Sequence, residues 1–410
     1  MATLARSPQP HGGIATQPIA SRWPTHAPDE IAIVADVLRS GRVNGLHHGE
    51  WCKAFEAGFA DLCAMPHAIA LANGTLALEV ALRALGIGSG AEVIVPARSF
   101  MATASCVIAC GAKPVFADID PDSQSLTADT IAEVLTPRTR AIIVVHLGGY
   151  PAPMEEIAAL ATSREIALIE DCAQAHGATI AGRRVGSFGD AGAFSFCTDK
   201  IMSTGGEGGM LVLRSSAVWA RAWAFKDHGK DHGLLYQTTG GTGFRWLHRS
   251  FGSNYRLTEL QAAIGMLQLG KLDGWIAQRR QNAATLLDQL DGLAALRLVR
   301  PGPDIGHAYY KFYAFVRPDR LRQGWTRDRI VAEAQAQGLP CQTGSCPEIY
   351  LEQACIDAGL GPSDRLPVAR ALGETSIMLP VDPTLDEATC RTMGTVLRAI
   401  IERGSSDARD

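Results

Sequence analysis

The chain has 410 residues, of which 47% are hydrophobic and 20% charged, and its formal net charge is −4. This length exceeds one ordinary hydrophobic core, so we expect a folded protein of two domains. The small negative charge gives no reason to expect a nucleic acid or a membrane surface as partner, and neither a membrane-spanning run nor a signal peptide is apparent, so we expect a cytoplasmic location.

Ten cysteines are scattered along the chain without a CxxC pair. The closest spacings are Cys106 to Cys110 and Cys341 to Cys346, and several cysteines lie inside apolar runs. Zinc and iron–sulfur sites require other ligand spacings. We therefore expect buried reduced thiols and no metal site.

The first two thirds of the chain alternate strand and helix patterns. Residues 1–22 are rich in Pro, Gly, Ser and Ala and are expected to form a flexible arm. The later alternation predicts a mainly parallel sheet with helices on both faces, in which ligands bind beyond the carboxyl ends of the strands. The predicted elements are, in order, strand 68–71, helix 75–85, strand 92–95, helix 101–110, strand 114–117, strand 141–146, helix 154–162 and strands 166–170, 191–196 and 210–213.

A Gly-rich stretch without clear periodicity, 229–252, interrupts this pattern. A helical segment then extends from Leu257 to about Leu290, with an expected break near Gly270. The remainder predicts a smaller α/β unit, and we place the domain boundary near residue 285. Its predicted elements are strand 309–316, helix 326–337, strand 339–342 and helix 386–402.

Two of the predicted strands end in residues suited to a phosphate and a flat ring. Asn73, Gly74 and Thr75 follow strand 68–71, where glycine permits close approach and the helix start offers free N–H groups to an anion. Such a turn is more often simply a helix cap. Phe100, beyond strand 92–95, can stack on a flat ring, although phenylalanine is usually a core residue.

Two further strand ends carry charged side chains. Asp171 closes the apolar strand 166–170, where an unpaired buried carboxylate would be costly; its partner could be a protonated pyridine nitrogen, a helix N-terminus or a structural cation. Lys200 lies between strand 191–196 and a glycine-rich turn. Beside a cationic cofactor its ammonium would readily lose a proton and become a nucleophile, whereas a solvated surface lysine is the commoner alternative. Together the four strand ends offer receptors for a phosphate, a flat ring, a pyridinium nitrogen and an aldehyde.

At these positions the sequence resembles the DegT/DnrJ/EryC1/StrS aminotransferases, fold-type-I enzymes that aminate keto sugars and cyclitols. The resemblance extends from about Trp23 to Leu397. It implies pyridoxal 5'-phosphate as cofactor, a mainly parallel seven-stranded sheet in a large domain 23–285, a smaller C-terminal α/β domain 286–410, and a homodimer with shared active sites. The matching blocks are ALANGTLALEVALRALGIGSGAEVIVP, EDCAQAHGA, GAFSF…K…GGEGGM and NYRLTELQAAIGMLQLGKL.

Carried over by position, the resemblance implies a role for each site residue. Lys200 forms the Schiff base with the cofactor, and Asp171 keeps the pyridine nitrogen protonated. Gln174 contacts the phenolic oxygen of the ring, and Phe100 stacks on the ring. Asn254 reaches the phosphate of the neighbouring subunit; its alternative role is to cap the helix that starts near Leu257. The remaining phosphate contacts are Gly74, Thr75 and Ser195.

Two segments depart from the family pattern. Cys197-Thr198-Asp199 precede the lysine where many relatives have an aromatic residue or histidine followed by proline, although the spacing from Ser195 to Lys200 is intact. Segment 344–350 lacks the histidine that many sugar aminotransferases carry there, which bears on the substrate more than on the reaction. Candidates for substrate contacts, each of which could equally be ordinary rim or fold structure, are Arg245, His307, Tyr309, Lys311 and Tyr350.

The resemblance implies transfer of an amino group from glutamate or glutamine to a keto sugar, in most cases nucleotide-linked, in amino-sugar, polysaccharide or secondary-metabolite biosynthesis. The alternative acceptor is a keto-cyclitol. Dehydratases of the family replace the lysine by histidine, and a non-catalytic regulator that binds the cofactor would be expected to lose the lysine or the aspartate; this chain keeps Lys200 and Asp171. A dinucleotide-binding fold is not expected, because Gly86-x-Gly88-x-Gly90 follows a helix rather than a strand.

Overall fold

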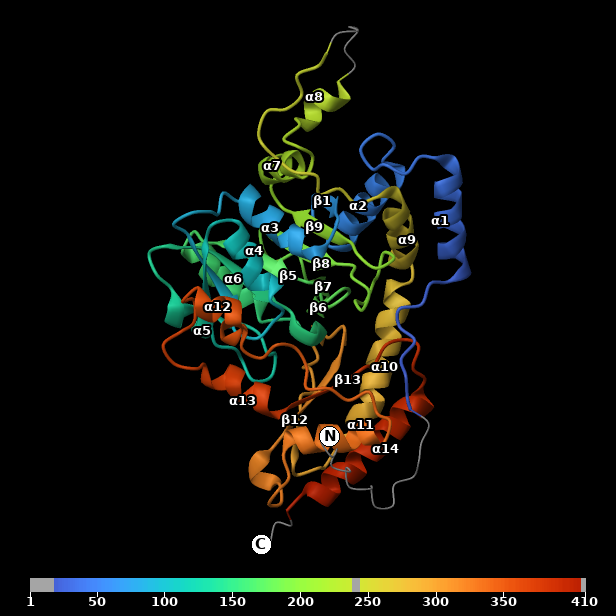
Figure 1. The fold of residues 1–410 in the computed structure, drawn as a ribbon, viewed down its shortest axis with the longest axis vertical. Coiled ribbons are helices and arrows are strands. Elements are labelled where there is room, and N and C mark those ends of the chain that lie inside the picture. The colour runs from blue at the N-terminus through green and yellow to red at the C-terminus, as the bar shows by residue number, and fades with distance from the viewer. Residues whose placement is uncertain (1–17, 238–243, 407–410) are drawn as a thin grey trace, which may run out of the picture.

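A seven-stranded sheet forms the centre of the molecule (Figure 1). The computed structural model describes residues 18–237 and 244–406. The strand order is β1-β9-β8-β5-β4-β2-β3, and β9 runs antiparallel to its neighbours while the other pairs within β8 to β3 are parallel. The carboxyl ends of β1, β8, β5, β4 and β2 therefore meet at one edge. The strands are β1 (His67–Leu71), β2 (Glu92–Pro96), β3 (Lys113–Ala117), β4 (Thr139–Val145), β5 (Ala167–Asp171), β8 (Ala191–Ser195) and β9 (Gly209–Leu213).

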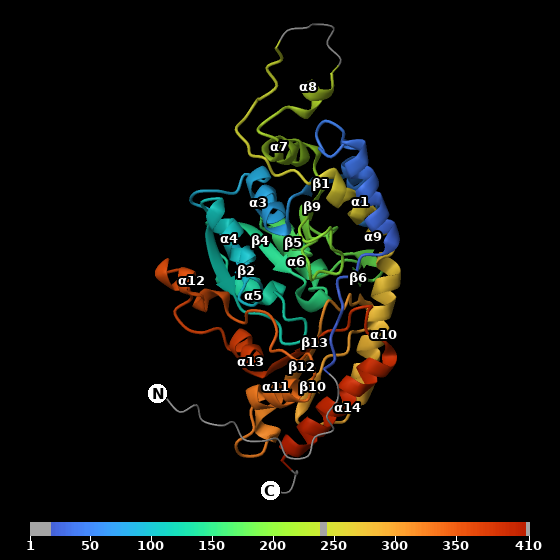
Figure 2. The same ribbon diagram turned by 45° about the vertical axis from the view of Figure 1, so that its right-hand side comes forward.

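Helices cover both faces of this sheet (Figures 1 and 2). Because successive side chains of a strand point to opposite faces, Ile69 and Leu71 pack in one core with α3, α4 and α7, whereas Ala68 and Ala70 pack in another with α2. This double burial explains why the strands read as continuous apolar runs. The helices of this part are α1 (Pro28–Ser40), α2 (Glu50–Leu62), α3 (Gly74–Ala84), α4 (Ala102–Ala109), α5 (Ala128–Val134), α6 (Met154–Ser163) and α7 (Ser216–Lys226).

A second, three-stranded antiparallel sheet has the order β10-β12-β13. The last helix packs with it around a separate apolar core, which explains the alternation of strands and helices in this part. Two-residue strands form a third small sheet. The elements are β10 (Leu296–Leu298), β12 (Phe312–Val316), β13 (Ser376–Leu379), α11 (Arg327–Ala336), α12 (Gln353–Asp357), α13 (Pro367–Thr375) and α14 (Glu387–Gly404), with β6 (Thr179–Ile180), β7 (Arg183–Arg184) and β11 (Ile305–Gly306) in the small sheet.

The long helical segment is broken where we expected, between α9 (Glu259–Leu269) and α10 (Leu272–Leu290). The boundary predicted near residue 285 falls inside α10. Leu272 and Ile276 of this helix belong to the core of the large sheet, whereas Leu286 and Leu290 belong to the core of the second sheet. The division into two domains stays a prediction, and these separate cores support it.

One segment, of which residues 227–237 and 244–254 are described, projects away from the sheet at the end where α7 and α8 (His232–Tyr236) lie (Figures 1 and 2). It carries three large side chains that are strongly exposed: Phe244 at 79%, Trp246 at 83% and Phe251 at 98%. Exposed large apolar side chains that lie close together are a common feature of protein–protein contact surfaces.

Some predicted elements differ from the structure. The strand expected over 309–316 begins only at Phe312, because Tyr309 adopts a left-handed backbone with φ +47°. The strand expected over 339–342 is absent: Pro340 has no N–H to donate, and only Gln342 pairs with Met378. Helices α1 and α2 precede the region in which we predicted elements.

The arm expected over 1–22 lies outside the described residues up to position 17. Of the rest, Ile19 donates its backbone N–H to the carbonyl of Gly338 at 2.9 Å. Within the described ranges, no helix is both long and apolar enough to cross a membrane.

Candidate active site

A cavity of about 630 Å³ opens at the edge of the sheet where the carboxyl ends of β1, β8, β5 and β2 meet. Parallel strands bring these ends together although they are far apart in the sequence. The other side of the cavity is closed by Tyr313 and Met378 of the second sheet and by Lys311, which directly precedes β12. Seven of the eight residues that we predicted to bind the cofactor line it, namely Gly74, Thr75, Phe100, Asp171, Gln174, Ser195 and Lys200.

One end of the cavity is suited to a phosphate. Asn73 caps α3 by accepting the N–H of Leu76 at 2.9 Å, and the exposed Thr75 stands in the first turn beside the remaining free N–H groups. A Cβ at Gly74 would lie 2.6 Å from the Cβ of Ser195, so only glycine lets β8 approach the helix start this closely. The turn is thus both a helix cap and an anion receptor, and it brings Ser195 beside the helix N-terminus.

Asp171 lies at the end of β5 and is 7% exposed. Its Oδ1 accepts the N–H of Ala173 at 3.1 Å, and its Oδ2 accepts the hydroxyl of Thr103 at 3.4 Å. No lysine, arginine or histidine among the described residues forms an ion pair with it, and burial raises the pKa of this carboxyl above its ordinary value. A cation bound against Asp171 would remove that cost.

Lys200 lies in the turn after β8, and its side chain is 17% exposed. Its Nζ is 3.9 Å from Oδ1 of Asp199 and 4.9 Å from the centroid of the Tyr310 ring. The indole N–H of Trp23 donates to the backbone carbonyl of Lys200 at 2.8 Å and holds the turn. The amine therefore faces the cavity instead of solvent, as the hypothesis that Lys200 is a nucleophile requires.

Gln174 and Phe100 border the space between these two charges. The side-chain oxygen of Gln174 accepts the N–H of Gly148 at 2.7 Å, which directs the amide N–H₂ to other partners. Gln174 lines the cavity, so this amide can donate to an anionic oxygen there. Phe100 is 68% exposed at the cavity, an unusual position for a phenylalanine and one suited to covering a flat ring.

The residues present fit pyridoxal 5'-phosphate. The buried carboxyl of Asp171 lacks a cationic partner, the helix start beside Gly74 offers unpaired N–H groups, and Lys200 presents an amine in the same cavity. These features match the pyridinium nitrogen, the phosphate and the aldehyde carbon of the cofactor.

Asn254 does not line the cavity of its own chain. It is exposed and pairs through its backbone with Asp227, at the base of the projecting segment. Its alternative role as a helix cap is wrong, because α9 begins at Glu259 and Thr258 is its N-cap, with Gln261 completing a capping box. Among the described residues, the side chain of Asn254 has no hydrogen-bond partner.

Of the five substrate-contact candidates, the structure brings only Lys311 to the cavity. His307 and Tyr309 stack on each other at 3.7 Å and border a separate surface hollow with Arg280. Arg245 donates to backbone carbonyls of α8 in the projecting segment. Tyr350 is 3% exposed in the apolar core, where its hydroxyl contacts Glu348.

Two residues beside Lys200 were not among our candidates. Tyr310 lines the cavity, and its hydroxyl donates to the carboxylate of Asp199. Burial and this carboxylate raise the pKa of Tyr310 far above its ordinary value. Asp199 could have been chosen as a candidate because it departs from the family pattern. No feature of the sequence indicated that Tyr310 lies beside Asp199.

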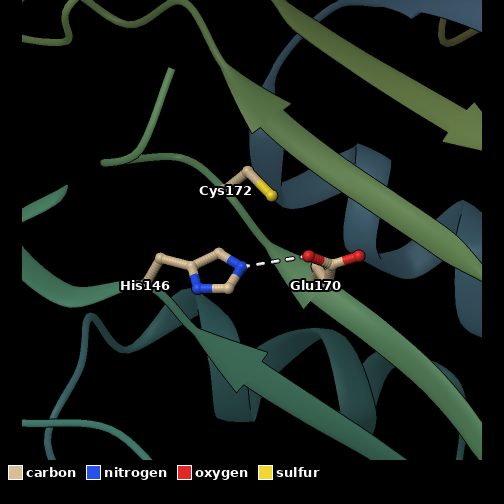
Figure 3. Close-up of side chains that lie close together, drawn as sticks. All are labelled: His146, Glu170 and Cys172. Carbon is tan, nitrogen blue, oxygen red and sulfur yellow. Dashed lines mark hydrogen bonds and ion pairs between the residues drawn. The ribbon is translucent and has the colours of Figure 1, made fainter. Parts of the chain in front are cut away.

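A second polar group lies directly behind Asp171: His146, Glu170 and Cys172, all fully buried (Figure 3). Nδ1 of His146 accepts the N–H of Ala152 at 3.1 Å, so Nε2 carries the proton and donates to Glu170 at 3.2 Å. The two carboxylate oxygens of Glu170 also accept the N–H groups of Gly186, Phe188 and Gly189. These hydrogen bonds occupy the carboxylate, which identifies the group as a structural clamp between β4, β5 and the turn before β8.

Residues 24–398 match the sequence profile of the DegT/DnrJ/EryC1/StrS aminotransferase family. GDP-perosamine synthase of Caulobacter vibrioides is 36% identical over 83% of this chain and 87% of its own length. L-glutamine:2-deoxy-scyllo-inosose aminotransferase of Micromonospora echinospora is 37% identical over 73% of this chain and 72% of its own. An aminotransferase structure from Psychrobacter cryohalolentis is 46% identical, with a TM-score of 0.91 over 93% of this chain and 99% of that one.

Proposed function

The chain belongs to the DegT/DnrJ/EryC1/StrS aminotransferase family, and from this premise we propose that it moves an amino group from glutamate or glutamine to a nucleotide-linked keto sugar. It is a pyridoxal-phosphate-dependent transaminase of amino-sugar biosynthesis, and its mainly parallel seven-stranded sheet is that of the related structures. The observation that carries the proposal is the common cavity of Lys200 and Asp171, in which an amine faces an unpaired buried carboxyl.

We propose that the cofactor is held by the residues at the strand ends. Gly74, Thr75 and Ser195 would hold the phosphate, Phe100 would cover the ring, and Gln174 would donate to its phenolic oxygen. When bound, the cofactor supplies an electron sink for the carbanion that forms at the reacting carbon. Solved relatives of this chain include one with the pyridoxamine form bound.

Lys200 is proposed to hold and move the proton at the reacting carbon. Its Nζ must be a neutral amine to accept the proton from Cα of the amino donor and to return one on the cofactor side. Asp171 would hold the proton at the pyridine nitrogen, since a cation bound beside its buried carboxylate stabilises the charged form. Asp199 and Tyr310, which are hydrogen-bonded to each other, lie beside the lysine amine and would orient it.

We also propose a homodimer that shares its active sites. Phe244, Trp246 and Phe251 on the projecting segment are exposed and suited to an interface, and the side chain of Asn254 at its base makes no hydrogen bond within the described chain. A second copy would bring this asparagine to the phosphate end of the first.

All ten cysteines are free thiols, which supports our proposal of a cytoplasmic location.

The keto acceptor is to be found by separating the two half-reactions. Glutamate or glutamine should convert the bound cofactor from its pyridoxal to its pyridoxamine spectrum. The aminated protein is then offered nucleotide-linked keto sugars and keto-inositols, and return of the pyridoxal spectrum identifies the acceptor. If a keto-inositol restores the pyridoxal spectrum and no nucleotide-linked keto sugar does, the result would favour the inosose activity named for the Micromonospora relative. Absence of any donor-dependent change would contradict the transaminase and favour a dehydratase or a regulator.

A further inference from the structure

Both cationic and anionic side chains line the cavity. Lys200 and Lys311 are the two cationic side chains among the described lining residues. The carboxylates there are those of Asp171, Asp199 and Glu207. Asp199 already accepts the hydroxyl of Tyr310, and Asp171 lies where the cofactor nitrogen is proposed to bind.

Among the described residues, Lys311 forms no ion pair, and its cavity position is fixed by the backbone. It precedes β12, where its backbone N–H donates to the carbonyl of Gly148 at 3.3 Å and fixes its position. No carboxylate among the described residues pairs with its Nζ, which instead lies 4.9 Å from the centroid of the Tyr310 ring. Burial lowers the pKa of Lys311, and Arg279 and Lys200 act in the same direction, while Asp199 and Asp382 oppose it. A half-buried ammonium in this position would gain strongly from a bound anion.

The amino donor brings such an anion to this cavity. In glutamate and glutamine alike, a carboxylate is attached directly to the carbon that loses its proton. Lys200 does not suit this carboxylate, because its amine must be neutral when it takes the proton. Two buried arginines behind the wall do not line the cavity. Arg98 donates to Gln124 and Ser376, and Arg279 faces the carbonyls of Tyr309 and Tyr310.

We propose that Lys311 binds the α-carboxylate of the amino donor and so orients the Cα–H bond toward Lys200. This inference rests on the proposed transaminase function and adds the residue that recognises the donor. The centroid of the Tyr310 ring lies 4.9 Å from Nζ of Lys200 and 4.9 Å from Nζ of Lys311, so the two nitrogens face the same ring. The keto sugar carries no carboxylate at its reacting carbon, so its half-reaction does not require Lys311.

The test compares Lys311→Met, which keeps the length of the side chain and removes its charge, with Lys311→Arg, which keeps a charge. Lys113→Met is the matched control, since Lys113 is exposed at the start of β3, away from the cavity. Glutarate, an unreactive carboxylate probe, is titrated calorimetrically into each cofactor-loaded protein. Lys311→Met should weaken its binding about tenfold or more, Lys311→Arg should retain most of it, and the control should match the wild type.

Measuring the two half-reactions separately shows which substrate anion Lys311 binds. Lys311→Met should raise the concentration of glutamate and of glutamine needed for half-maximal conversion by a similar factor, and leave that of the keto sugar unchanged. Unchanged binding of glutarate and both donors would overturn the inference. An effect on glutamate alone would assign Lys311 to the side-chain carboxylate, and an effect on the keto sugar alone would assign it to the nucleotide phosphates; both results contradict the proposal.

Two controls keep these results interpretable. Bound cofactor is measured by absorbance in every variant, so that a lost cofactor is not mistaken for a lost carboxylate contact. If Lys311→Met does not fold, Lys311→Gln takes its place with the same expected outcomes. Wild-type protein that binds glutarate but is not converted by either donor would contradict the transaminase function and leave the binding test of Lys311 intact.

Discussion

Among single residues, Lys200 is the first to test, because its amine faces the cavity, whereas Lys226 and Lys230 do not line it. Lys226 lies against the ring of Trp223, and Lys230 pairs with Asp227 at 2.7 Å. Borohydride reduction of the loaded protein should fix the cofactor on the peptide that contains Lys200. Lys200→Ala should fold and bind the cofactor without turnover. Mass spectrometry that finds the label on Lys226 or Lys230 would overturn the assignment.

Asp171 is expected to matter for the rate through its charge. Asp171→Asn keeps the shape of the side chain and removes the charge that would hold the pyridinium proton. We expect a loss of about 3 kcal/mol or more in transition-state stabilisation, measured from kcat/KM with the best donor. A variant within about tenfold of the wild type would make Asp171 a structural residue.

The same carboxyl should lower the stability of the cofactor-free protein at neutral pH. Burial raises its folded pKa above the unfolded value of about 3.9. The favourable contribution of the protonated form is therefore complete below that value and is lost as the pH rises through the raised folded pKa. Without cofactor, Asp171→Asn should be more stable to urea than the wild type at pH 8, and this advantage should shrink toward pH 4.5. An asparagine variant that is less stable at both values would contradict this account.

Among the elements, the structural clamp behind Asp171, formed by the hydrogen bonds of His146 and Glu170, should act mainly on the stability of the fold. Glu170 joins β5 to the turn before β8 through three backbone N–H groups, so Glu170→Gln would place an amide N–H₂ against donors. We expect a loss of about 2–4 kcal/mol in the free energy of unfolding, measured by urea denaturation. The control is Glu374→Gln, which breaks an exposed pair with Arg370 on α13 and should leave stability unchanged. An equal effect of the two substitutions would show that the buried clamp has no special role.

For the whole molecule, the central prediction is that Asn254 acts in the partner's site. Inactive Lys200→Ala chains mixed with impaired Asn254→Ala chains would form heterodimers in which one site has both wild-type residues. Activity should then rise above either parent, up to about a quarter of the wild type under random exchange. If Asn254 acts within its own chain, every chain with Lys200 keeps the defect and mixing restores nothing. No recovery after demonstrated subunit exchange would reject the shared site.

The parallel sheet, the break in the long helix near Gly270 and the strand ends that carry Gly74, Asp171 and Lys200 were all predictable from the sequence. These features depend on local signals: apolar runs of strand length, glycine-bearing turns and charged residues where such runs end. The order of the four matching sequence blocks along the chain indicated the family. Local periodicity was insufficient at 309–316 and 339–342, where a left-handed Tyr309 and the missing N–H of Pro340 interrupt the pattern.

Which distant residues share the cavity depends on long-range packing. Asp199 and Tyr310 are more than 100 positions apart and meet because the second sheet closes over the carboxyl edge of the first. The same closure brings Lys311 to the wall and leaves Tyr350 in the core and His307 at another surface. The side-chain type at a position indicates what chemistry it can perform. Its distance from a cofactor depends on long-range packing, which no local pattern encodes.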